Sequence, residues 1–135
     1  MNKLIITGHS QGLGKALAEY YLQQGWQVLA ISRREWPQAP EHLQQCVLDL
    51  ADSHRLQQVL SGGILADFLS GADQWLLINN AAQVAPNALA GKAGLPPIAS
   101  AVSLNILAPL LLCEEAIRAA PPAGLGGIVH ISSGA

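Results

Sequence analysis

The stretch that decides the fold is residues 7–14, which read Thr-Gly-His-Ser-Gln-Gly-Leu-Gly. An apolar run over 3–7 predicts a β-strand before it, and apolar residues spaced three and four apart predict a helix over 13–24 after it. At such a junction Gly8 permits a tight turn, Gly12 lets the backbone approach a pyrophosphate, and Gly14 lets helix and strand pack closely. The helix N-terminus adds free N–H groups and the partial positive charge of the helix dipole. An ordinary glycine turn is the alternative, and the position between strand and helix disfavours it. The candidate ligand-binding residues of this glycine loop are Gly8, His9, Ser10, Gln11, Gly12, Leu13 and Gly14.

The rest of the chain alternates in the same way between apolar runs and helical periodicity. Further strands are expected over 27–31, 45–48, 75–78 and 127–131. Helices are expected over 53–60, with Ser53 as the N-cap, over 64–69 as a separate turn, and over 98–119, after a loop at 84–97. This order predicts an α/β fold: a Rossmann-like, doubly wound parallel sheet of about five strands in the order 3-2-1-4-5, within one domain over residues 1–135.

Composition narrows the class of protein. The 135 residues carry a net charge of −2, with 12% charged and 50% hydrophobic residues, which excludes a disordered chain. Nucleic-acid binding through a basic surface is not expected, because no cluster of Lys and Arg is available to displace counterions. The two cysteines lack metal-ligand spacing and are too few for a disulfide scaffold. No leader and no apolar run of about 18 residues is found, so we expect a cytoplasmic protein with no membrane segment.

Four further motifs follow the glycine loop in order: Asp49-Leu50, Asn79-Asn80-Ala81, Asn105 and Ile131-Ser132-Ser133. Together with the spacing G-x-x-x-G-x-G, they make the chain resemble the short-chain dehydrogenase/reductase family. The resemblance implies that Asp49, beside Leu50, contacts the adenine of a dinucleotide. It also implies that Asn80 and Ala81 belong to the motif that steadies the central sheet at the cofactor site, and that Asn105 and Ser133 are catalytic. Ser132 is the alternative to Ser133 if the register slips by one residue.

Within the family, five short strings resemble the benzil-reductase and sepiapterin-reductase-like branch of carbonyl reductases. These strings occupy residues 10–14, 31–35, 84–86, 107–109 and 131–135. Members of that branch depend on NADPH, so the resemblance implies reduction of a small-molecule ketone or diketone to an alcohol. A catalytically inactive dinucleotide-binding or interaction module is the alternative function.

The end of the second expected strand bears on the choice of dinucleotide. A carboxylate there bonds the ribose 2′-hydroxyl of NAD, whereas an arginine accepts the 2′-phosphate of NADP. This strand ends in Ser32 and Arg33, with no acidic residue before Glu35. We therefore expect NADP(H) to be bound by Ser32 and Arg33, with His9 and Ser10 as additional candidates. The alternative is a solvated basic turn in which Glu35 pairs with Arg34.

Pro109 lies inside the long expected helix and has no N–H to donate to the carbonyl of Asn105, four residues earlier. A kink that frees this carbonyl is therefore expected. In the family that the chain resembles, the corresponding carbonyl holds a water that links the catalytic lysine to solvent. An ordinary buried asparagine beside a proline kink is the alternative.

The family's general acid is a tyrosine in a Y-x-x-x-K motif beyond the catalytic serine. The tyrosines of this chain, Tyr20 and Tyr21, fall on the first expected helix, away from the nicotinamide. A tyrosine of that kind protonates the carbonyl oxygen as hydride arrives. We therefore expect residues 1–135 to be an incomplete domain that is inactive by itself, and the activity to belong to the complete protein.

The expected helix over 98–119 is apolar around most of its circumference. A helix that covers one face of a sheet needs only a single apolar stripe, so a second buried face is expected. The resemblance implies a four-helix interface between subunits. We expect a homo-dimer or homo-tetramer, and poor solubility for residues 1–135 alone.

Overall fold

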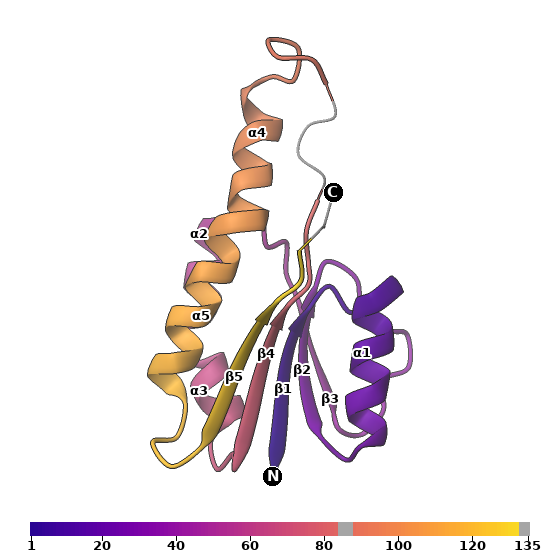
Figure 1. Ribbon diagram of the computed structural model, residues 1–135, viewed down its shortest axis with the longest axis vertical. Coiled ribbons are helices and arrows are strands. Elements are labelled where there is room, and N and C mark those ends of the chain that lie inside the picture. The colour runs from indigo at the N-terminus through magenta and orange to yellow at the C-terminus, as the bar shows by residue number, and fades with distance from the viewer. Residues whose placement is uncertain (84–87, 133–135) are drawn as a thin grey trace.

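The computed structural model describes residues 1–83 and 88–132, so the string at 84–86 and Ser133 lie outside the described residues. Its strands are β1 (Asn2–Thr7), β2 (Gln27–Ser32), β3 (Leu43–Val47), β4 (Gln74–Asn79) and β5 (Leu125–His130). They form one parallel sheet in the order β3-β2-β1-β4-β5, which confirms the expected α/β fold and strand order. All strands therefore end at one edge, the upper edge in Figure 1.

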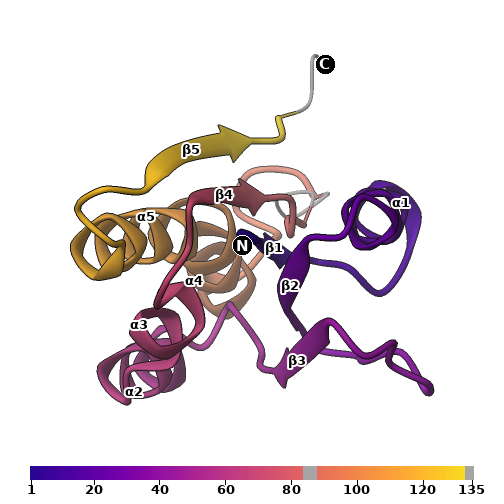
Figure 2. The same ribbon diagram turned by 90° about the horizontal axis from the view of Figure 1, so that it is seen from below.

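The helices divide between the two faces of this sheet. They are α1 (Gly12–Gln23), α2 (Ser53–Ser61), α3 (Ile64–Leu69), α4 (Leu95–Val102), the π-helical turn η1 (Ser103–Leu107) and α5 (Ala108–Ala119). Figure 2 shows α1 on one face and the other helices on the opposite face. Covering on both faces explains why the central strands are continuous apolar runs rather than alternating ones.

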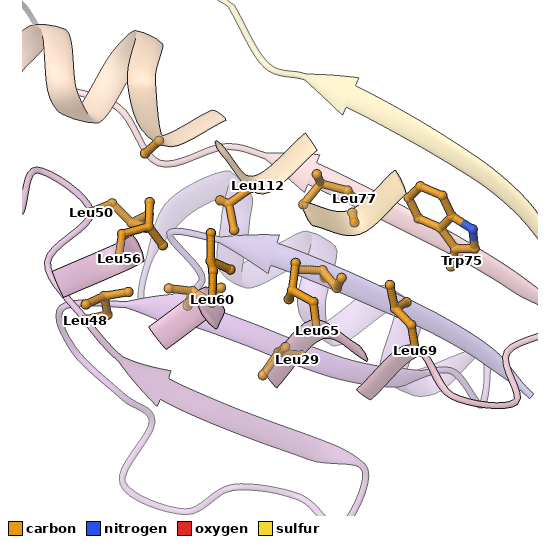
Figure 3. Close-up of a cluster of buried hydrophobic side chains, with 14 of the residues drawn as sticks. Leu29, Leu48, Leu50, Leu56, Leu60, Leu65, Leu69, Trp75, Leu77 and Leu112 are labelled. Atoms are coloured by element: carbon orange, nitrogen blue, oxygen red, sulfur yellow. The ribbon is translucent and has the colours of Figure 1, made fainter. Parts of the chain in front are cut away.

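Successive side chains of β1 point into two different cores. Ile5 belongs to the core beneath α2, α3 and α5, where Leu29, Leu77 and Leu112 are also fully buried. Leu4 and Ile6 belong to the core beneath α1. Figure 3 shows the first core as leucines gathered between the helices and the sheet. Each buried leucine or isoleucine contributes about 1.5–3 kcal/mol relative to an exposed one.

The two outer glycines of the loop have the roles that their spacing predicts. Gly8 has φ +73°, a backbone conformation that a side chain disfavours, and it turns the chain off β1. A Cβ atom at Gly14 would overlap the carbonyl oxygen of Gly8 and would lie 2.5 Å from Nδ2 of Asn80. The close approach of α1 to the end of β1 therefore requires glycine at position 14.

Several expected boundaries were wrong. The N-cap of α2 is Asp52 rather than Ser53, because the Asp52 carboxylate accepts a hydrogen bond from the Arg55 N–H at 3.1 Å. Two strands are shifted: β3 spans Leu43–Val47 instead of 45–48, and β5 spans Leu125–His130 instead of 127–131. The long helix begins at Leu95 rather than 98, since Pro96 and Pro97 fit its first turn, where no N–H is needed.

The helical segments α4, η1 and α5 form one continuous helix over Leu95–Ala119. A π turn lies where the kink is expected: the Ala108 N–H bonds the carbonyl of Ser103, five residues earlier. By length and hydropathy this helix could cross a membrane, contrary to expectation, because no charged residue lies between Lys92 and Glu114. The core helix of a soluble protein passes the same test, and α5 packs Leu112 and Ala116 into the first core.

Candidate dinucleotide-binding site

A cavity of about 460 Å³ opens at the carboxyl edge of the sheet, where a doubly wound fold places its ligands. Segments after four of the strands line it, together with one face of the long helix. The lining residues are Gly8, Ser10, Gln11, Gly12, Ser32, Arg33, Arg34, Leu48, Asp49, Leu50, Ala51, Asn80, Ala81, Ala82, Gln83, Ser100 and Leu104. Most of the expected binding residues therefore meet in one place.

The glycine loop brings the N-terminus of α1 to this cavity. The N-cap residue Gln11 makes no side-chain capping bond, and the first turn of α1 contains no acidic residue. The N–H groups of that turn have no partner within the helix, and the helix dipole places partial positive charge there. Gly12 has φ +61°, and a Cβ at this position would meet nothing within 4 Å. This end of the cavity suits a phosphate group.

The end of β2 adds two cationic side chains. Arg33 and Arg34 are both exposed and both line the cavity, and Ser32 is buried with its Oγ 3.5 Å from the Arg34 N–H. Among the described residues, the ion pairs are Met1–Asp73 and Glu115–Arg118. The alternative of a solvated basic turn required an ion pair between Glu35 and Arg34, and this pair is not formed in the described part of the chain. The arginines remain available to an anionic ligand.

Asp49 follows β3 and is the acidic residue of the cavity lining. One carboxylate oxygen accepts a hydrogen bond from the Ala51 N–H at 2.9 Å, which fixes the side chain in a turn. The other carboxylate oxygen remains available as an acceptor for an amino group of a ligand.

Thr7 and Asn80 fasten the glycine turn to the end of β4. The Thr7 hydroxyl accepts hydrogen bonds from the N–H groups of Asn80 at 3.0 Å and Ala81 at 2.9 Å. The Asn80 amide donates to the carbonyl of Gly8 at 3.1 Å. The motif at 79–81 thus braces two neighbouring strand ends, and Thr7 is a participant that sequence reasoning missed although it directly precedes the loop.

Asn105 lies on the π turn and holds the segment after β4. Its amide oxygen accepts from the Gln83 N–H at 3.0 Å, and its amide nitrogen donates to the Gln83 carbonyl at 2.8 Å. The side chain is half-buried and does not line the cavity. Its main-chain carbonyl lacks the usual helical donor because Pro109 has no N–H. Ser133, the other expected catalytic residue, lies outside the described residues.

His9 does not contact the cavity, so its expected role as a phosphate ligand does not fit. Its side chain is 1% exposed and lies 2.6 Å from Oε1 of Gln45. Leu13 and Gly14 are also outside the lining. The lining residues that sequence reasoning missed include Ser100 and Leu104, whose four-residue spacing on a helix would have been the signal.

Tyr20 and Tyr21 lie on α1, and Tyr21 packs edge-on against Trp26, away from the cavity. A separate polar contact joins Asn79, Cys113 and His130 beside α5. Burial raises the pKa of the Cys113 thiol, which therefore stays protonated at neutral pH and is a poor nucleophile.

Comparison with known proteins agrees with this geometry. Residues 2–135 match the model of the short chain dehydrogenase family. The benzil reductase ((S)-benzoin forming) of Bacillus subtilis is 37% identical across the whole chain, which covers 56% of that enzyme. A crystal structure of a short-chain dehydrogenase/reductase from Burkholderia vietnamiensis is 40% identical with a TM-score of 0.92, over 98% of this chain and 66% of that one. A 4-hydroxyisoleucine dehydrogenase complexed with NADH is 20% identical with a TM-score of 0.74, over 87% of this chain and 49% of that one, and shares the fold.

The chain belongs to the short-chain dehydrogenase family of oxidoreductases. It spans a little over half the length of the Bacillus subtilis enzyme that it matches. The cavity at the glycine loop is therefore the candidate site for a nicotinamide dinucleotide.

Proposed function

We propose that the complete protein is an NADP(H)-dependent carbonyl reductase that converts a ketone or diketone to an alcohol. The observation that carries the proposal is the pair of uncompensated arginines, Arg33 and Arg34, in the same cavity as the glycine loop. A 2′-phosphate would gain charge-assisted hydrogen bonds there, whereas the carboxylate that selects NAD is missing from the end of β2. Similarity to benzil reductase supports a carbonyl substrate.

The residues of the chain divide the work by their place around the cavity. The first turn of α1 would hold the pyrophosphate, Arg33 with Ser32 the 2′-phosphate, and Asp49 the adenine amino group. Asn105 would fix the segment after β4 through Gln83. When bound, the cofactor supplies a hydride to the carbonyl carbon, and a proton must reach the carbonyl oxygen.

No tyrosine among the described residues lines this cavity, so the proton donor has to come from elsewhere in the complete protein. We therefore propose that residues 1–135 alone bind the dinucleotide without reducing carbonyls.

The assembly that we propose is a homo-dimer or homo-tetramer formed through the outer face of the long helix. Apolar side chains four residues apart are exposed there, including Ile106 at 56% and Leu110 at 61%. Such a continuous apolar patch is typical of a subunit interface.

The test is turnover by the full-length protein with benzil as substrate. We expect NADPH oxidation at 340 nm that depends on benzil, benzoin as the product, and slower oxidation of NADH. Binding of NADPH without turnover on any diketone or ketone would favour the inactive dinucleotide-binding module instead.

A further inference from the structure

Three side chains that lie outside the cavity connect the glycine loop to the turn of Arg33 and Arg34. These are the two segments that would hold phosphate groups. His9 belongs to the glycine loop, Trp36 follows the Arg33–Arg34 turn, and Gln45 lies on β3. The Trp36 indole N–H donates to the main-chain carbonyl of His9 at 2.9 Å, and the two rings lie 5.5 Å apart. We call these three residues the loop clamp.

Gln45 fixes the geometry of the loop clamp through the main chain of Trp36. The Trp36 N–H donates to Oε1 of Gln45 at 2.7 Å, and Nε2 of Gln45 donates to the Trp36 carbonyl at 3.3 Å. A backbone N–H can only donate, so these bonds identify the oxygen and the nitrogen of the amide. Nε2 of His9, 2.6 Å from Oε1, must therefore carry a hydrogen. Nδ1 of His9 is buried with no hydrogen-bond partner among the described residues.

The loop clamp lies between two segments that line the cavity, the glycine loop and the turn of Arg33 and Arg34. The carbonyl that Trp36 holds lies between Gly8 and Ser10, which both line the cavity. On the other side, only Glu35 lies between Arg34 and Trp36. The bond from the Arg34 N–H to Ser32 is long, at 3.5 Å, so the bonds to Trp36 are the shorter restraints on this turn.

We propose that the loop clamp positions the arginine turn against the glycine loop and thereby sets the preference for a 2′-phosphorylated dinucleotide. The proposal rests on the function proposed above, in which this cavity binds NADP(H). A ligand whose two phosphate groups are held at a fixed separation can bond to both loops only when the distance between the loops matches that separation. The strength of charge-assisted hydrogen bonds depends closely on that geometry, and a half-buried network of hydrogen bonds restrains it. His9, Trp36 and Gln45 are thus positioning residues.

The test compares two small ligands that would occupy only the part of the cavity between the glycine loop and the arginines. These ligands are adenosine 2′,5′-bisphosphate and adenosine 5′-monophosphate. Trp36→Phe removes the indole N–H and keeps an aromatic ring, and Gln45→Leu removes the amide. Trp26→Phe, in the core beneath α1, and Gln44→Leu, at an exposed position of β3, are matched controls. Calorimetry on the full chain measures the affinity ratio of the two ligands for each variant, and circular dichroism verifies folding.

We expect both clamp variants to weaken the bisphosphate about three- to tenfold, the loss typical of one or two hydrogen bonds, and to weaken the monophosphate less than twofold. The controls should keep the wild-type ratio. If the wild-type protein prefers the bisphosphate but Trp36→Phe and Gln45→Leu keep that ratio, or lower both affinities equally, the clamp proposal is overturned and the proposed function stands. A wild-type protein with no preference for the bisphosphate would overturn both.

Discussion

The two ends of the sheet differ in how completely the chain covers them. β2 is buried along almost its whole length, whereas β5, the edge strand beside β4, is exposed or half-buried throughout. Figure 2 shows α1 beside β1 and β2, and none of the described helices on the corresponding side of β5. The half that carries the glycine loop is packed by its own residues, while the β5–α5 half presents apolar surface that needs a cover. The glycine loop and the arginines of the candidate site lie in the packed half, and the proposed assembly surface lies in the other, while the long helix contributes to both.

Substitution of Gly14 should lower the free energy of unfolding most, because Gly14 makes the closest contact in the packed half. In Gly14→Ala the new methyl group overlaps the Gly8 carbonyl, which belongs to the backbone and cannot move aside. We expect a loss of about 3 kcal/mol or more in the free energy of unfolding, measured by urea titration.

Gly12→Ala is the matched control in the same loop, since nothing lies within 4 Å of its Cβ position. It should lose only about 1–2 kcal/mol, the cost of a left-handed conformation. Equal losses in the two variants would show that close packing is not the reason for glycine at position 14.

A pair of leucine truncations compares a buried position of the sheet with an exposed position of the long helix. Leu29 is fully buried on β2, and Leu110 on α5 is 61% exposed. Leu29→Ala should lower the free energy of unfolding by about 2–5 kcal/mol because it leaves a cavity. Leu110→Ala should change it by less than about 0.5 kcal/mol in dilute protein. Similar losses at both sites would contradict the exposure of Leu110 on the outer face of the long helix.

The open half also contains a tight contact, between β5 and β4. A Cβ at Gly126 would overlap the indole ring of Trp75, its neighbour across the strand pair. Gly126→Ala should therefore cost about 1–3 kcal/mol and alter the fluorescence of Trp75.

Gly127→Ala is its control, because there the new atom meets the end of the Leu76 side chain at 3.2 Å, a group that can rotate. A spectrum unchanged by Gly126→Ala would contradict the packing of Trp75 on this glycine.

The smallest effect on stability is expected from Leu110→Lys, which should act on assembly instead. A charge in the exposed apolar row of the long helix would have to be desolvated in an interface. Light scattering on the full-length protein should show a dimer or tetramer for the wild type and a smaller species for the variant. Tyr20→Lys, at a residue of α1 that is 54% exposed, should leave the mass unchanged. A monomeric wild type would contradict the proposed interface.

Local signals in the sequence were sufficient for the architecture. The spacing of Gly8 and Gly14 around a strand–helix junction predicted a contact that the structure contains, and the order of apolar runs predicted the sheet. Boundaries were less accurate where neighbouring residues have similar propensities. Asp52 and Ser53 are both good N-caps, and only the backbone geometry selects Asp52.

The site was harder to predict where it depends on contacts between distant residues. His9 looked like a ligand in the glycine loop, but it is buried and its side chain contacts Gln45, which lies 36 positions later. The contribution of Ser100 and Leu104 likewise depends on how the long helix crosses the carboxyl edge of the sheet. Such placements arise from tertiary packing: the spacing of Ser100 and Leu104 puts both residues on one face of a helix, but it does not determine what that face covers.

The most direct test of a phosphorylated dinucleotide at this cavity is calorimetry of the full-length protein with NADPH and NADH, before and after Arg33→Ala. We predict tighter binding of NADPH by the wild type, a loss of about tenfold or more for NADPH in the variant, and a change below twofold for NADH. Arg55→Ala, on α2 and outside the cavity lining, should leave both affinities unchanged. Equal affinities for the two dinucleotides in the wild type, or an Arg33→Ala variant that binds NADPH as tightly as the wild type does, would contradict the account.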